Sequence, residues 1–551
     1  MTFPLIFHLN THLLGDGGDG WENYWNLWWF KKAIFELNTN PYFSSYIFYP
    51  HGHSLLFHSL NPFNGLLSLP LQTFLGLKTT YNILMVFTFV TAGLGMYLLV
   101  RKLTRHSLAA LISGYIFTFA PKHFSHALGH LNIASIEWLP FYILFLIKTH
   151  KEGGVRNATC TAIFLILNGL CSWYHLMNCL IFSFFYGVFF SLKERSTVAI
   201  RRTAIVIGMV LTVLSPFLFV MFKEFSVGNY SSGHNPELWS ADLLSFFVPG
   251  QIQSIGGVYT GITSKFLGNI AENGNYIGYS VLFFLVHSIL KTKRTPTKHF
   301  FFFAGALFFI LSLGPYLYIA GNNMSFKLPY FYLHAISPFF QFSGVPMRFH
   351  IMTMLCFSVL SGYSLKWYFE NNTSYKNKRM LSVILILLCV EYWVAPFYLS
   401  SFPSKSTRSF SVDKPVNVPS FYYQLANEND DFAVFDVERG PLYQQRRGEV
   451  IYYQTVHNKS IIGGSVSRFN QDYFDFILKT PGIRSVLENR HVLTNGERDS
   501  PEEVQKVFAD LRIKYVIVPS MESGFPQNTI VEEFGFRKVF ENELIYVYRV
   551  Y

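Results

Sequence analysis

Two aspartates in a glycine-rich turn are the first residues whose types and spacing could support chemistry. Residues 15–20 read GDGGDG, so Asp16 and Asp19 lie three positions apart between glycines. Because glycine adopts positive φ angles without steric cost, the turn can bring both carboxylates to one point. The structural alternative is that Asp19, which directly precedes a helix, caps that helix and complements its dipole. One cap does not require two aspartates, so we predict a functional role for at least one.

Three histidines follow in the stretch YPHGHSLLFHSLNPF, which holds His51, His53, His58 and Asn61. The His-x-His pair could bind a divalent metal together with the aspartates of the glycine-rich turn, because imidazole and carboxylate are both metal ligands. The same side chains could instead hydrogen-bond a phosphate group or close a loop. The sequence leaves these alternatives open.

Five further polar residues lie between the apolar stretches or at their outer ends: His130, Glu137, His175, Glu272 and Arg348. For each one taken singly, a structural role is the alternative. Together they are predicted to line a cavity at the outer face of a membrane. Arg348 would suit a phosphate group there, because guanidinium offers a planar fork of hydrogen-bond donors.

The composition indicates the membrane. Half of the 551 residues are hydrophobic and only 14% are charged, whereas soluble proteins carry about 25% charged residues. The net charge of +11 does not indicate nucleic acid, because 18 of the 26 Lys and Arg residues within 1–402 fall in five short segments. Such clustering is the positive-inside pattern of membrane proteins. The five cysteines all lie in apolar stretches and form no disulfide or zinc pattern.

With the five basic segments placed in the cytoplasm, we predict an all-α polytopic membrane domain of about ten transmembrane helices. The predicted crossings lie near residues 79–100, 107–121, 134–148, 158–172, 176–192, 203–222, 276–291, 300–314, 348–366 and 380–398. The long loops then share the extracytoplasmic side with the C-terminal tail; they comprise residues 15–62, 223–275 and 315–347. The protein is therefore expected in the cell (inner) membrane.

Two segments near the N-terminus depart from simple crossings. Only 14 residues precede the glycine-rich turn, too few for a full span, so we expect that a first helix is missing from this sequence. Residues 63–77 are short and contain Pro70, which favours an interfacial or re-entrant helix. The helix after the turn places Trp21, Trp25 and Trp28 on one face, and we expect it to lie on the membrane surface.

The C-terminal tail reads as a soluble domain. The stretches DFAVFDVE, KYVIVP and LIYVYRVY are rich in β-branched and aromatic residues and predict strands. Ser500, Pro501 and Glu503 form a capping box that opens the helix PEEVQKVFADLR. We therefore divide the chain into a transmembrane domain, 1–402, and a small extracytoplasmic α/β domain, 403–551.

Three stretches carry a resemblance to a known superfamily. GDGGDGWENYWNLWW, FSGVPMRF and YYQTVHNKSIIGGSVSR are similar to uncharacterised bacterial and archaeal membrane proteins of the GT-C glycosyltransferase superfamily. The resemblance implies a polyprenyl-phosphate-linked sugar donor, an extracytoplasmic glycan, lipid or protein acceptor, and a base from the first loop. That role would fall on Asp19 or Asp16; we favour Asp19 as the base, with Asp16 as its helper or as a metal ligand. Whether the pair holds Mg or Mn is left open.

Two other functions compete with a transferase. A transporter or flippase for a lipid-linked glycan should carry polar residues near mid-membrane in repeated halves. Here the carboxylates concentrate in the outer loops, and the sequence shows no internal repeat, which favours the enzyme. A non-catalytic membrane assembly partner is the third alternative, and a missing first helix would favour it.

Overall fold

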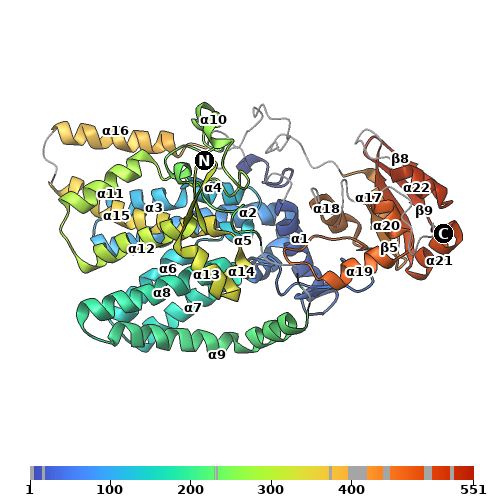
Figure 1. Cartoon of the computed structure of the whole chain (residues 1–551), viewed down its shortest axis with the longest axis horizontal. Helices are drawn as coiled ribbons and strands as arrows, with labels where there is room; N and C mark the ends of the chain where they lie inside the picture. The colour runs from blue at the N-terminus through green and yellow to red at the C-terminus, as the bar shows by residue number, and fades with distance from the viewer. Residues whose placement is uncertain are drawn as a thin grey trace.

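A helical body and a C-terminal sheet lie at opposite ends of the molecule, with the first loop and its helix between them (Figure 1). The computed structural model describes residues 5–14, 19–228, 230, 234–371, 375–394, 418–437, 447–488, 499–520 and 527–551. Asp16 and the expected domain boundary at residues 402–403 lie outside these ranges.

A helix lies in each of the ten predicted crossings, as far as the structure describes them. The helices are α2 (Pro62–Thr104), α3 (Ser107–Thr118), α6 (Trp138–Lys151), α7 (Val155–Cys171), α8 (Trp173–Glu194), α9 (Val198–Val227), α11 (Tyr279–Lys291), α12 (Pro296–Ser312), α15 (His350–Asn371) and α16 (Tyr375–Glu391). Four described segments are long and apolar enough to cross a membrane: Pro62–Thr104, Leu131–Lys151, Trp173–Glu194 and Val198–Val227. The molecule therefore has a helical membrane body, and the number of about ten crossings stays a prediction.

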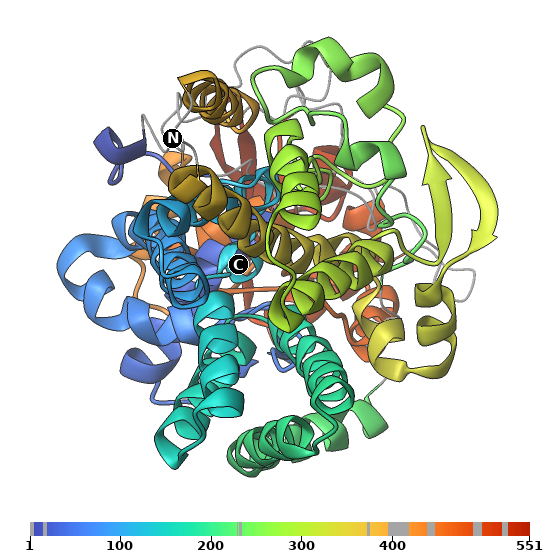
Figure 2. The same cartoon turned by 90° about the vertical axis from the view of Figure 1, so that its left-hand side faces the viewer.

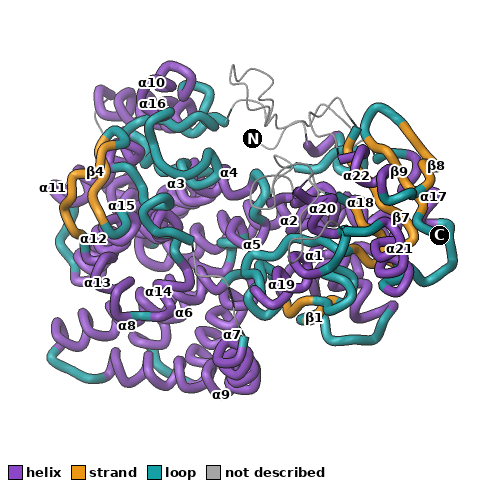
Figure 3. Tube along the Cα trace, turned by 45° about the vertical axis from the view of Figure 1, so that its right-hand side comes forward, coloured by secondary structure: helices purple, strands orange, loops and turns teal. Residues whose placement is uncertain are grey.

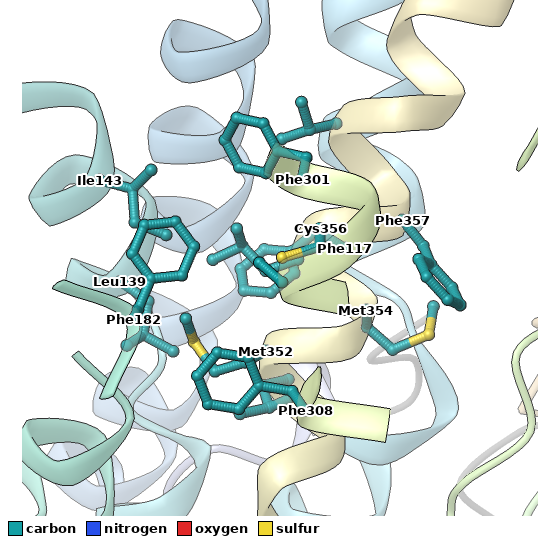
Figure 4. Close-up of a cluster of buried hydrophobic side chains, with 14 of the residues drawn as sticks. Phe117, Leu139, Ile143, Phe182, Phe301, Phe308, Met352, Met354, Cys356 and Phe357 are labelled. Carbon is teal, nitrogen blue, oxygen red and sulfur yellow. The ribbon is translucent and has the colours of Figure 1, made fainter. Parts of the chain in front are cut away.

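The helices pack around one apolar core, seen in Figure 4 with side chains from α3, α6, α8, α12 and α15. Phe117, Phe301 and Cys356 are all fully buried there. Gly305 allows the contact between α12 and α15, because a Cβ at this position would lie 2.8 Å from the ring of Phe357. In contrast, α9 lies at the rim of the body (Figure 2) and exposes Phe219 and other apolar side chains, as expected of a lipid-facing helix.

Helix α2 breaks at Gly76, whose φ of 75° and ψ of 164° are not helical. The break separates residues 62–75 from the long apolar part of the helix, so the predicted short helix at 63–77 exists as a distinct segment. Asn61 caps it by accepting a hydrogen bond from the amide of Asn64 at 3.2 Å.

Short elements fill the segments between the long helices. They are η1 (Leu5–Phe7), α1 (Asp19–Lys31), η2 (Lys32–Glu36), β1 (Phe43–Ser44), β2 (His53–Ser54), α4 (Pro121–Ala127), α5 (Leu131–Ala134), η3 (Leu243–Phe246), η4 (Gly256–Tyr259), α10 (Thr260–Thr263), β3 (Tyr316–Ile319), β4 (Asn322–Lys327), α13 (Pro329–Ile336), α14 (Pro338–Ser343) and η5 (Pro346–Phe349). The β3–β4 hairpin stands at the end of the body away from the tail (Figure 3).

The tail forms a five-stranded mixed sheet of order β6-β5-β7-β9-β8. Its strands are β5 (Ala433–Asp436), β6 (Ser460–Ile461), β7 (Ile513–Pro519), β8 (Arg537–Glu541) and β9 (Ile545–Arg549), and its helices are α17 (Ser420–Ala426), α18 (Arg447–His457), α19 (Gln471–Lys479), α20 (Ile483–Glu488), α21 (Pro501–Asp510) and α22 (Gln527–Glu533). The three predicted strands are confirmed as β5, β7 and β9. The Ser500 hydroxyl accepts from the Glu503 amide at 3.1 Å, as the capping box predicted for α21.

The expectation that α1 lies on the membrane surface by its tryptophan face is wrong. Trp25 is fully buried, and its indole N–H donates to Oε1 of Gln454 in α18 at 2.8 Å. Trp21 packs on Tyr452 of the same helix, with ring centroids 4.5 Å apart. The aromatic face of α1 is therefore covered by the tail, and its tryptophans form part of the protein core.

Candidate functional site

Asp19 begins α1 and pairs with His130, whose Nε2 lies 2.7 Å from the carboxylate Oδ2. Asn23, one turn along α1, fixes this arrangement, because its side-chain amide donates to the carbonyls of both Asp19 and Gly129 at 2.9 Å. Gly20 lies in close contact with Gly129, since a Cβ at this position would meet Cα of Gly129 at 3.6 Å, an ordinary van der Waals distance. The first turn of α1 is thus held against the loop before α5.

The pair is held in its charged form. The positive charge of His130 lowers the pKa of the Asp19 carboxyl to about 2. Burial disfavours the protonated imidazole, but the Asp19 carboxylate outweighs it and raises the pKa of His130. The Asp19 side chain is 56% exposed, and only its Oδ2 has a partner among the described residues. The second carboxylate oxygen, Oδ1, is therefore ionised and has no partner within the described part of the chain.

Glu272 is the centre of a second, buried cluster. Its Oε2 lies 3.1 Å from Nζ of Lys122 and 3.2 Å from Nε2 of His126, and its Oε1 accepts from Nε of Arg348 at 2.8 Å. Burial alone would raise the pKa of Glu272, but Arg348 and Lys122 hold it well below its usual range. One buried carboxylate thus pairs with two basic side chains, Lys122 and Arg348.

The Arg348 guanidinium has two terminal amino groups that can donate to a ligand. Only its Nε has a hydrogen-bond partner within the described part of the chain, and both terminal amino groups remain available. The guanidinium also lies over the ring of Tyr174, 4.4 Å from its centroid, which is a favourable cation–π geometry. The side chain is therefore fixed on one edge and one face, with a planar pair of donors left for a ligand.

The tail contributes Arg468, which sequence reasoning did not single out although it ends the stretch GGSVSR. Its Nη1 donates to the Ser467 carbonyl at 2.7 Å and lies 3.4 Å from Nε2 of His234. Burial lowers the pKa of Arg468, and the positive charge of Arg348 acts in the same direction. Two guanidinium groups from distant parts of the chain therefore share one electrostatic environment.

Residues 461–470, the tail arm, are fastened to the first loop. The amides of Phe48 and Tyr49 donate to the carbonyls of Gly463 and Ile461, both at 3.0 Å. Gly464 permits the contact, since a Cβ there would lie 2.9 Å from the Ile47 side chain. The tail arm therefore has a fixed position against the loop that precedes α2.

Glu22 is a buried residue of α1 that the sequence analysis did not single out, and it also holds the tail arm against the first loop. Its carboxylate accepts from the hydroxyls of Ser59 at 2.6 Å and of Ser465 and Ser467, each at 3.1 Å. Helix α1 thus connects the charged site at Asp19 with the tail arm that carries Arg468.

The three histidines of the first loop contact the tail and, among the described residues, are not arranged as a group of metal ligands. His53 and His58 are buried, and their ring nitrogens accept from the amides of Asn470 and Ser467 at 3.1 Å. Burial lowers the pKa of His53 to about 4, so its ring is neutral. His51 is exposed and packs on Phe476, with ring centroids 4.8 Å apart. All three contact the tail.

The remaining predicted residues lie behind the site. His175 is buried and its Nε2 lies 3.0 Å from the Ile133 carbonyl. Glu137 is fully buried, with Oε1 3.9 Å from Sγ of Cys171. No group of three or more His, Cys, Asp or Glu side chains within the described ranges could hold a metal ion. Because Asp16 lies outside those ranges, metal binding by Asp16 and Asp19 stays a prediction.

Comparison with solved structures identifies the class of fold. The arabinofuranosyltransferase AftD from Mycobacteria matches with a TM-score of 0.55 and 12% identity, over 92% of this chain and 36% of that one. ArnT from Cupriavidus metallidurans, bound to undecaprenyl phosphate, matches with a TM-score of 0.52 and 9% identity, over 99% and 95%. The chain therefore has the fold of GT-C membrane glycosyltransferases, as the sequence resemblance implied.

The sequence also assigns the chain to a family, which is a narrower group than the fold class. Residues 2–390 match DUF6311, a domain of unknown function, and the chain belongs to this family. No curated protein matches the sequence.

Proposed function

We propose that this protein is a membrane glycosyltransferase that moves a sugar from a polyprenyl-phosphate donor to an extracytoplasmic acceptor. The observation that carries the proposal is the pairing of opposite charges at one site. The positive charge of Arg348 contributes to the lowered pKa of the Asp19 carboxyl, and the two terminal amino groups of Arg348 have no acceptor among the described residues.

Arg348 and Arg468 receive the donor phosphate in this proposal. A guanidinium binds phosphate oxygens through two parallel N–H donors, and positive charge stabilises a phosphate that leaves as an anion. Glu272 fixes Arg348 through Nε, so the terminal amino groups are already oriented before the donor binds. The undecaprenyl phosphate in the ArnT structure supports a lipid phosphate as the leaving group.

Asp19 orients the acceptor hydroxyl through its free oxygen and takes its proton as the new glycosidic bond forms. A carboxyl with a pKa of about 2 stays ionised at every physiological pH, so it is always ready to accept a hydrogen bond. The same low pKa makes it a weak base, so the proton moves late, when the attacking oxygen has already gained positive charge from forming the new bond. His130 holds the carboxylate in place and compensates its charge.

The side of the membrane follows from the charge pattern. The basic segments belong in the cytoplasm, which puts α1, the Arg348 segment and the tail on the extracytoplasmic side of the cell membrane. The chain is then divided into a membrane domain, 1–402, and an outer α/β domain, 403–551.

Extraction of lipid-linked sugars from cells with and without the gene tests the proposal. We expect one polyprenyl-phosphate sugar to accumulate in cells that lack the protein, because its consumer is absent. Wild-type protein should restore its normal level, and the Arg348→Ala variant at equal abundance should not. Unchanged lipid-linked sugars in all three strains would contradict the proposal.

A further inference from the structure

A separate cavity lies where the tail meets the far end of α1. Its volume is 420 Å³, and it opens between the C-terminal half of α1, the break of α2 at Gly76, and the tail helices α17 and α18. Tyr24, Trp28 and Tyr452 form part of its wall. Figure 1 shows α1 and α18 side by side, and the tail thus completes the cavity from outside the helical body.

The cavity carries an excess of positive charge. Lys31 and Lys78 both line it, and no carboxylate of the described residues lies within 4.0 Å of either ammonium group. The one acidic residue of the lining, Glu36, is already paired with Lys32 at 3.0 Å. Two uncompensated ammonium groups in a partly enclosed space favour an anion.

The segments that flank the cavity expose large apolar side chains. Phe74, two residues before the lining residue Gly76, is 84% exposed, and Phe35, next to the lining residue Glu36, is 62% exposed. Exposed apolar side chains of this size favour contact with hydrocarbon, and the tyrosines and tryptophan of the cavity wall favour the boundary between hydrocarbon and water. An occupant should therefore be charged at its head and apolar at its tail.

We propose that this cavity binds the phosphate-bearing headgroup of an anionic membrane lipid, with Lys31 and Lys78 as the phosphate ligands. It is distinct from the donor site, because twelve residues of helix separate Lys31 from Asp19 and place them about 18 Å apart. The lipid would fix the tail helices α17 and α18 against the membrane body from the side opposite to the tail arm. The inference does not depend on the proposed transferase activity.

Native mass spectrometry of the purified full chain measures this binding directly. The protein is titrated with phosphatidylglycerol, with zwitterionic phosphatidylcholine, and with soluble glycerol phosphate. The double variant Lys31→Ala/Lys78→Ala should bind phosphatidylglycerol about 30-fold more weakly than wild type, if each lysine contributes as basic residues near anionic membranes do. The matched control, Lys265→Ala/Lys506→Ala, removes two lysines outside the cavity and should bind like wild type.

Each outcome decides the proposal. Selective binding of phosphatidylglycerol that is lost only in the cavity variant supports it. Equal binding of both lipids, or equal loss in both double variants, would overturn it. Glycerol phosphate that competes as well as the intact lipid would show a soluble phosphate site and would also overturn it. A double variant that fails to fold is replaced by Lys78→Met alone, which keeps the length of the side chain and should still weaken the selectivity.

Discussion

Replacement of Glu272 by glutamine should destabilise the protein more than any other single loss of charge in the site. Glu272 is 1% exposed, and among the described residues it is the one carboxylate that forms an ion pair with Lys122 or Arg348. Glutamine keeps the shape but leaves two buried cations without a counter-charge. Breaking a buried pair in this way costs about 3–5 kcal/mol.

The size of the expected thermal shift follows from the length of the chain. An unfolding entropy of about 2.1 cal/mol/K per residue gives about 1.2 kcal/mol/K for a chain of this size, so the loss lowers Tm by about 3–4 °C. The nine tryptophans allow the melt to be followed by fluorescence in detergent. Glu502→Gln, at an exposed position in the first turn of α21, is the matched control and should melt like wild type.

A second substitution separates charge from shape. Lys122→Met on top of Glu272→Gln removes one of the two orphaned cations, so it should recover part of the lost stability. If Glu272→Gln melts at the wild-type temperature, or if the double variant is less stable by the sum of both losses, the buried cluster does not balance charge as described.

Three further outcomes are expected. Arg348→Lys should retain folding but lose most transfer activity, because lysine keeps the charge and loses the planar fork; full activity would remove Arg348 from the phosphate site. The ion pair with Asp19 stabilises the protein fully below the unfolded His130 pKa of 6.5, and this stabilisation is lost as pH rises through the raised folded pKa. The Tm difference between wild type and His130→Gln should therefore shrink on going from pH 6 to pH 9. A constant difference would contradict the ion pair. Cysteine at Ser196 should be shielded from impermeant thiol reagents in intact cells and cysteine at Lys506 labelled; the reverse pattern would place the site in the cytoplasm.

Local patterns in the sequence predicted the local structure well. The ten apolar stretches are helices, and three β-rich stretches are strands, because helix and strand periodicity depend on neighbours within a few residues. The capping box at Ser500 is satisfied within three residues. The two short strands, β6 and β8, were not predicted; β6 has two residues, and β8 has an almost wholly exposed face.

Contacts between distant segments could not be predicted in the same way. Lys122 and Glu272 are 150 residues apart, and no spacing rule relates them. The tryptophans of α1 fit either a membrane surface or a protein core, and the tail decided between them. Arg468 reaches the site only because the tail arm pairs with the first loop.

The measurement that tests the central claim most directly is sugar transfer by the Asp19→Asn variant, in membranes with matched amounts of protein. Asparagine keeps the size of the side chain and can still accept a hydrogen bond from His130, but it cannot take a proton. We expect the variant to fold and insert normally and to transfer sugar about 10²–10⁴-fold more slowly than wild type, while the control Glu502→Gln remains fully active. Near-normal transfer by Asp19→Asn would contradict the account, because the carboxylate assigned as the base would then have no part in the reaction.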